Sequence, residues 1–153
     1  MTTPRPVRVT VTHRFEANAE DVFDAWTDPD IVSKWMLAAP VQDEDVVRIS
    51  VDARAGGRFS FVVRREGLEL DHQGQYLEID RPRRLVFTWG VNEDPGETSV
   101  VTVEIAPSLD GGCELTLTHE MIDKWADYAE RTRQGWGHII AAIAQTIERA
   151  GAR

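Results

Sequence analysis

The chain has 153 residues, 42% of them hydrophobic, which suits one domain around a single core. Its 17 Lys and Arg against 26 Asp and Glu give a net charge of -9, so we expect no nucleic-acid partner and no anionic membrane surface, because both are bound through clustered Lys and Arg. The single cysteine, the absence of a signal-peptide core in "MTTPRPVRV" and the absence of an apolar run of roughly 20 residues predict a cytoplasmic protein with no internal disulfide and no membrane insertion.

Residues 7–16 alternate between apolar and polar side chains, which predicts a half-buried strand. Helical spacing follows, with Asn18 as the candidate N-cap and the Asp28-Pro29 pair as the stop. A second short helical stretch lies past Pro29 and ends before Pro40. The apolar residues of this predicted helix pair are Val22, Phe23, Trp26, Ile31 and Trp35. Two small connected helices are therefore expected after the first strand.

Strand periodicity returns at Asp45 and continues through a long middle section. The alternating apolar runs lie at 47–51, 59–63, 70–80, 85–89, 101–105 and 113–121. Turn sequences such as "RAGG", "REG" and "LDGG" separate them. Hairpins in series predict an antiparallel meander.

From about Lys124 to the end the spacing is helical. One stripe of this helix carries Trp136, Ile140, Ile143 and Ile147. Gly135 and Gly137 flank Trp136, although each Gly inside a helix costs about 1 kcal/mol relative to Ala. Because the stripe keeps its period, we expect one continuous helix whose small residues let helix and sheet approach closely; a helix break at Gly135 is the alternative. An apolar-faced sheet and one apolar-faced helix predict an α+β domain in which the sheet curls around the helix.

Sequence motifs for metal, phosphate or nucleophilic chemistry are missing. His13, His72, His119 and His138 match no metal-ligand spacing, and "RAGGRF" lacks the strand-to-helix context of a phosphate loop. No Gly-x-Ser-x-Gly elbow is present. We therefore predict no metal, no cofactor and no catalytic nucleophile.

Polar side chains on apolar strand faces are more informative. His13, His72 and His119 are each a satisfied core histidine, a strand-end residue near solvent or a polar group in a wet cavity. The aromatic residues exceed what a tightly packed small core requires, although most of them are still expected in the core. A sheet curled around one helix tends to leave space between them, so the surplus rings either line a cavity or complete the core. The expected lining of the cavity is Trp35, Phe59, Phe61, Trp89, Trp136 and Ile140, with His72, Tyr76 and His119 as polar contacts. Glu78 is either a buried carboxylate or a solvated residue, and we favour the solvated one.

Several blocks in order resemble one family. They are "AEDVFDAWTDPDIVSKWM", "VDARAGGRFSF", "HQGQYLEIDRPRRLVFTW", "TSVVTVEIAPSLDGGCELTLTHE" and "GWGHIIAAI". Together they are similar to the family of activator of heat-shock-protein-ninety ATPase homologues, within the START-like (SRPBCC) superfamily. The resemblance implies one domain over 1–153, ordered from about 7 to 150, with a helix-grip, Bet v-like fold. In that fold a seven-stranded antiparallel sheet surrounds a long C-terminal helix, with two small helices after the first strand and a hydrophobic cavity inside.

Three functions follow as hypotheses. The first is binding of a small hydrophobic molecule or lipid in the cavity. The second is an enzyme, such as a cyclase, dehydratase or hydrolase of a polyketide-like or aromatic substrate, which requires His72, Tyr76, Glu78 or His119 to converge. The third is a co-chaperone-like module that stimulates a chaperone ATPase. A homodimer is also possible if Trp26 or Trp125 is an exposed apolar anchor, and both are equally compatible with burial.

Overall fold

Strands form where apolar residues alternate in the sequence, and helices form where the apolar residues have helical spacing. The computed structural model describes residues 7–36, 44–91, 99–121 and 129–151. In chain order the elements are β1 (Val7–Phe15), α1 (Ala19–Asp24), α2 (Pro29–Met36), β2 (Glu44–Val51), β3 (Arg58–Arg65), β4 (Leu68–Asp80), β5 (Arg84–Val91), β6 (Ser99–Pro107), β7 (Cys113–Met121) and α3 (Ala129–Gly151).

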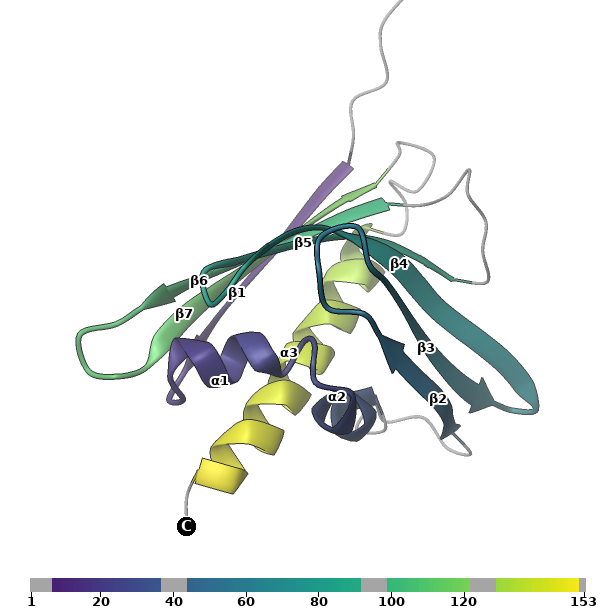
Figure 1. Cartoon of the computed structure of the whole chain (residues 1–153), viewed down its shortest axis with the longest axis horizontal. Helices are drawn as coiled ribbons and strands as arrows, with labels where there is room; N and C mark the ends of the chain where they lie inside the picture. Colours follow the sequence, from purple (N-terminus) through teal and green to yellow (C-terminus); the bar gives the residue numbers. More distant parts are fainter. Residues whose placement is uncertain (1–6, 37–43, 92–98, 122–128, 152–153) are drawn as a thin grey trace, which may run out of the picture.

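The strands form one antiparallel sheet in the order β1-β7-β6-β5-β4-β3-β2. Strands β2 to β6 each pair with the next strand in the chain, and β7 pairs with β1, so β1 and β2 are the two edges. Figure 1 shows the sheet bent over α3, with α1 and α2 on either side of that helix. The connection from one edge strand to the other thus runs through α1 and α2 across the inner side of the sheet. The predicted α+β helix-grip fold is confirmed.

The two short helices have the local signals expected of them. The side chain of Asn18 accepts a hydrogen bond from the backbone N–H of Asp21 at 2.9 Å, which caps α1. Pro29 both ends the preceding segment and occupies the first position of α2, where a missing N–H has no cost. Asp28 Oδ1 accepts from the backbone N–H of Asp30 at 2.9 Å. These contacts place the Trp26 and Trp35 rings against the inner side of the sheet.

Helix α3 runs without a break through the two glycines, as predicted. Trp136 is buried, whereas Gly135 is exposed. A Cβ atom added at Gly135 or Gly137 would meet nothing within 4 Å among the described residues. The expectation that these glycines bring helix and sheet together was therefore wrong. They lower the helix propensity around Trp136 without making room for a neighbour.

The backbone around Tyr76 is fixed from two sides. The β2–β3 turn bonds to β4, with Gly56 N–H donating to the Tyr76 carbonyl oxygen at 2.8 Å and Tyr76 N–H donating to that of Gly57 at 2.9 Å. A bulge in the β4–β5 pairing follows Tyr76 and leaves both Leu77 and Glu78 exposed. Tyr76 itself points inward and is 2% exposed.

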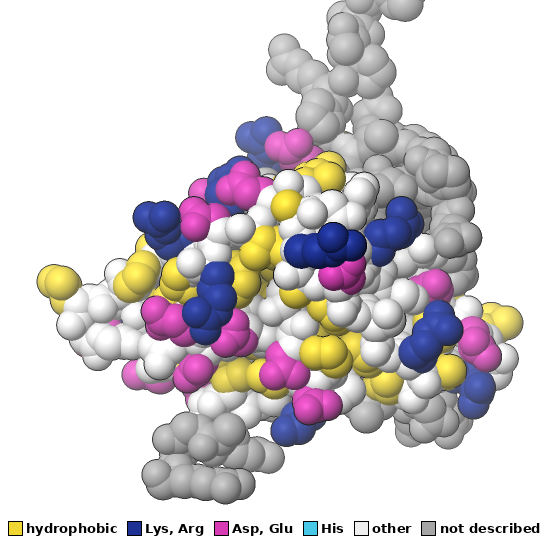
Figure 2. All heavy atoms as spheres, in the orientation of Figure 1, with side chains coloured by type: hydrophobic (Ala, Val, Ile, Leu, Met, Phe, Trp, Pro, Cys, Tyr) yellow, Lys and Arg dark blue, Asp and Glu magenta, His cyan; other side chains and the backbone are white. Residues whose placement is uncertain are grey.

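The outer surface carries charges of both signs. Figure 2 shows basic and acidic side chains interspersed over the face in view. On the strands Arg84 lies between Glu78 and Glu104, with nitrogen–oxygen distances of 3.1 and 3.0 Å. Glu78 is therefore a solvated residue, as favoured from the sequence. Exposed ion pairs of this kind contribute little stability individually.

Candidate functional site

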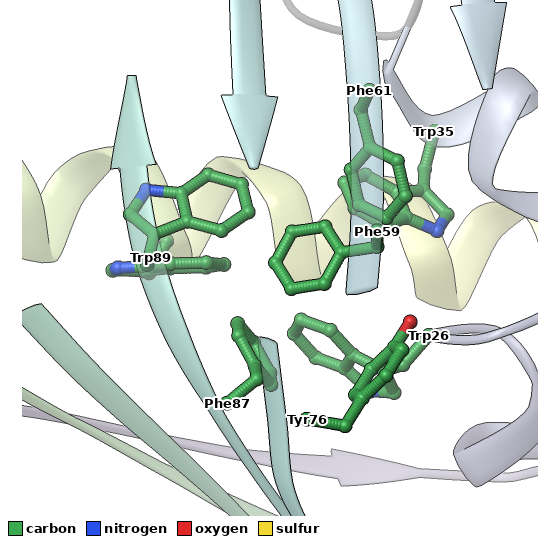
Figure 3. A pocket seen from close by; sticks show the side chains of 8 residues that line it. Trp26, Trp35, Phe59, Phe61, Tyr76, Phe87 and Trp89 are labelled. Atoms are coloured by element: carbon green, nitrogen blue, oxygen red, sulfur yellow. The ribbon is translucent and has the colours of Figure 1, made fainter. Parts of the chain in front are cut away.

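One aromatic pocket lies between α3, the helix pair and strands β3 to β5. Figure 3 shows its lining side chains, which face one another as a cluster of rings. They are Trp26, Trp35, Phe59, Phe61, Tyr76, Phe87, Trp89 and Trp136. The free space between these rings is about 10 Å³, room for about one water molecule.

Phe59 of β3 stands at the centre of this aromatic cluster. Its ring centroid lies 4.9 Å from that of Phe61, 5.3 Å from Tyr76 and 5.5 Å from Phe87. Trp136 joins the cluster from α3, with its centroid 5.1 Å from that of Trp89. Tilted and edge-to-face contacts at these distances add to the apolar area that the rings bury. The rings therefore fill most of the space that the curved sheet leaves below the helix.

Two polar atoms in this lining are buried without a partner. The indole Nε1 of Trp26 and the hydroxyl of Tyr76 have no hydrogen-bond partner among the described residues. Burial, and to a smaller extent the Asp52 carboxylate, raises the pKa of the Tyr76 phenol, so the phenol keeps its proton. The Trp35 indole, in contrast, donates to the Ala25 carbonyl oxygen at 2.8 Å. Unsatisfied buried donors are uncommon in folded proteins and call for an explanation.

A directional hydrogen-bond chain ties α3 to the sheet beside the pocket. The indole N–H of Trp136 donates to Nδ1 of His119 at 2.9 Å. Since Nδ1 accepts, the proton of the neutral imidazole is on Nε2, which donates to Ser99 Oγ at 2.5 Å. The Ser99 hydroxyl then donates to the Trp89 carbonyl oxygen at 3.1 Å. Burial lowers the pKa of His119 from 6.5 to about 4 and keeps it neutral.

This direction of bonding does not suit nucleophilic catalysis. A general base must offer a lone pair to the serine hydroxyl, whereas His119 offers Ser99 an N–H. His119 acts here as a bridge that holds the Trp136 ring in place.

The structure brings six of the nine predicted site residues to the pocket. Those six are Trp35, Phe59, Phe61, Tyr76, Trp89 and Trp136. Ile140 is buried in the core one turn after Trp136 and does not line the pocket. His119 reaches the pocket only through Trp136. His72 lies behind Trp89, with ring centroids 5.6 Å apart, and its Nδ1 donates to the Phe61 carbonyl oxygen at 3.2 Å.

Two residues of the pocket lining and one residue of the hydrogen-bond chain beside it were missed. Trp26 is 4% exposed and lines the pocket, so the alternative of an exposed dimer anchor was wrong for it; Trp125 lies outside the described residues. Phe87 shares its strand face with Trp89, a signal that was available in the sequence. Ser99 precedes the alternating Val101 by two positions, and the same-face rule could have placed it inward beside His119.

The acid/base candidates do not gather at one point. Glu78 is on the outer side of the sheet, and no hydrogen bond among the described residues joins any two of His72, Tyr76, Glu78 and His119. Within the described ranges, no three His, Cys, Asp or Glu side chains form a group that could hold a metal ion. The site is thus an aromatic pocket whose lining residues carry two unpartnered polar atoms. The four acid/base candidates are not arranged for catalysis at one point.

Residues 16–148 match the sequence profile of the activator of Hsp90 ATPase homolog 1-like proteins, and this match covers most of the chain. The chain belongs to that family. Comparison with curated proteins gave no match. Among the residues that the structure describes, no helix is long and apolar enough to cross a bilayer.

Solved structures share the family fold. SA2116 from Staphylococcus aureus, a protein of unknown function, superposes with a TM-score of 0.83 at 20% identity, with 98% of each chain covered. CV1439 from Chromobacterium violaceum gives 0.79 at 24% identity, covering 94% of this chain and 99% of that one. The AHSA1-like protein from Aeromonas hydrophila gives 0.79 at 25% identity, with 96% of each chain covered. At these identities the likeness establishes the shared architecture.

Proposed function

We propose that this protein binds a small hydrophobic molecule in the aromatic pocket between α3 and the sheet. The observation that carries the proposal is the convergence of eight aromatic side chains from α2, α3, three strands and the α1–α2 connection on one space. Ligand pockets in proteins are typically concave and aromatic, with a few placed polar groups. Membership of a helix-grip family supports the same location, since that fold places a cavity between helix and sheet.

A ligand must displace rings to enter, because the free space of about 10 Å³ is far below the roughly 300 Å³ of an ordinary ligand pocket. Trp136 is the ring whose backbone is best suited to move. The glycines beside it reduce helix stability by about 2 kcal/mol together and contact no neighbour that requires a small residue. We therefore place the opening of the pocket at the Trp136 turn of α3.

The experiment compares two variants that carry the same chemical change. Phe59→Leu alters the centre of the pocket, and Phe15→Leu alters a buried core position on β1 that does not line it. Binding of neutral aromatic probes such as cumene and acetophenone is measured by titration calorimetry and by thermal shift. We expect the wild type and Phe15→Leu to bind alike and Phe59→Leu to bind about two- to tenfold more weakly, since an aromatic contact contributes roughly 0.5–1.5 kcal/mol. Absence of binding to the wild type, or equal losses in both variants, would overturn the proposal.

A further inference from the structure

Two residues that line the pocket carry hydrogen-bond donors that the described protein does not use. Trp26 is 4% exposed and Tyr76 is 2% exposed, and both line the pocket. Neither the Trp26 Nε1 atom nor the Tyr76 hydroxyl has a partner among the described residues. In Figure 3 the Tyr76 side chain lies among the aromatic rings that line the pocket. A buried donor without an acceptor carries a desolvation penalty, so both atoms favour an occupant that supplies one.

The neighbouring indoles show that the fold can satisfy such donors. Trp35 donates to the Ala25 carbonyl oxygen at 2.8 Å, and Trp136 donates to His119 at 2.9 Å. Trp26 differs from both, although its ring centroid lies only 6.0 Å from that of Trp35 and 6.1 Å from that of Trp136. The missing acceptor is thus particular to Trp26, because the two indoles beside it in the same lining have acceptors within the protein.

The chemistry of the lining defines what can accept these bonds. The indole N–H only donates, and the phenol stays protonated, so the occupant must offer acceptor lone pairs. All eight lining side chains are aromatic and none is charged, so an anionic acceptor would enter without a counter-charge and lose its hydration. A carbonyl oxygen is neutral and has two lone pairs, which suits two donors.

We propose that the occupant of the aromatic pocket is a neutral aromatic carbonyl compound whose oxygen accepts hydrogen bonds from Trp26 and Tyr76. This inference rests on the proposed function, since it names the chemical class bound at the same site. The competing occupant is a single water molecule, for which the pocket has just enough room.

The test uses two probes of similar shape. Acetophenone carries the carbonyl group, and cumene replaces it with a branched hydrocarbon. Cumene is the more hydrophobic probe, so the two affinities in the wild type differ for reasons other than hydrogen bonding. The measured quantity is therefore the change that each variant causes in the ratio of the two dissociation constants. Each neutral hydrogen bond corresponds to about a five- to tenfold change in affinity. Tyr76→Phe and Trp26→Phe are therefore each expected to shift the ratio against acetophenone by about fivefold.

Trp35→Phe is the matched control for Trp26→Phe, because its indole already has an acceptor within the protein. We expect this variant to keep the wild-type ratio. The indole N–H signal of Trp26, assigned by its loss in Trp26→Phe, is expected to move downfield with acetophenone and not with cumene.

The free Tyr76→Phe protein is expected to be at least as stable as the wild type, since the variant removes an unpartnered buried hydroxyl. A marked loss of stability would mean that the hydroxyl already has a partner, such as water, and would overturn the inference. The inference would also be overturned if both probes bind and neither Tyr76→Phe nor Trp26→Phe changes the ratio of their dissociation constants. Failure of the wild type to bind either probe would instead refute the proposed function.

Discussion

Trp136 and His119 join the last helix to the last strand through one buried hydrogen bond, 2.9 Å from the indole nitrogen to Nδ1. The bond requires a neutral imidazole, because a protonated Nδ1 would present a second donor to the indole N–H. His119 is 4% exposed, and its remaining nitrogen is used by Ser99. The position of Trp136 over the pocket is therefore linked to the protonation state of one histidine.

Acid is expected to weaken this link. Burial lowers the pKa of His119 from 6.5 to about 4, so the unfolded chain binds the extra proton between these two values. The free energy of unfolding then falls as the pH drops from 6.5 to 4, by about 3 kcal/mol for this group. Urea titrations across this range measure the effect. His119→Gln keeps a donor and an acceptor without titrating, and its pH dependence should be flatter by that amount; parallel curves would contradict the assignment.

Removal of the Ser99 hydroxyl should destabilise the protein. Ser99→Ala leaves the Nε2–H of His119 buried without its acceptor, which costs about 1–3 kcal/mol. Ser50→Ala, an exposed serine on β2, provides the control and should change stability by less than about 0.5 kcal/mol. Equal effects in the two variants, measured by chemical denaturation, would show that the Ser99 bond is not formed.

Alanine at either glycine of α3 should stabilise the protein. Gly135→Ala and Gly137→Ala each gain about 1 kcal/mol in helix propensity, and neither new methyl group meets a described neighbour within 4 Å. The reverse change at an exposed position of the same helix, Ala141→Gly, should lose a similar amount. Thermal and urea unfolding measure all three.

The same two alanine variants test where the pocket opens. If Trp136 moves through local opening of the helix, each should slow the association of cumene in stopped-flow experiments by about fivefold, the factor that corresponds to about 1 kcal/mol. Unchanged association rates in stabilised variants would place the opening elsewhere.

Gly74 should be intolerant of any side chain. A Cβ atom at this position in β4 would lie 1.8 Å from the Thr88 carbonyl oxygen and 2.8 Å from the Phe59 ring. Gly74→Ala is therefore expected to cost about 3 kcal/mol by overpacking. Since the nearest atom belongs to the backbone, adding Phe59→Leu should not restore stability. Rescue by the double variant would show that the ring alone creates the constraint.

The fold could be predicted because each element has its own period in the sequence. Alternation placed the inward faces of β3 and β5, and with them Phe59, Phe61 and Trp89. Helical spacing placed Trp26 on the apolar face of the first short helix, but a helical period does not show which of the buried rings lines the pocket, so Trp26 was left out of the predicted lining. The role of the glycines of α3 was predicted wrongly because helix propensity gives only the cost of glycine in a helix. It does not show whether a neighbouring element packs against the glycine.

The size of the pocket could not be derived from composition. Eight aromatic side chains enclose a large space or fill it, depending on how the rings tilt against one another. Phe59 meets Phe87 edge-to-face at 88° and Trp89 nearly stacked at 29°, and these angles bring the free space down to about 10 Å³. Ring orientation is a tertiary property, set by contacts among β3, β5 and the neighbouring elements.

A crystal structure of the protein grown with acetophenone is the sharpest test of binding in the aromatic pocket. We expect electron density for the probe among the eight lining rings, with its oxygen toward Trp26 and Tyr76 and with Trp136 displaced from the position in the free protein. Density for the probe on the outer surface only, with the rings still closed around the same water-sized space, would contradict this expectation.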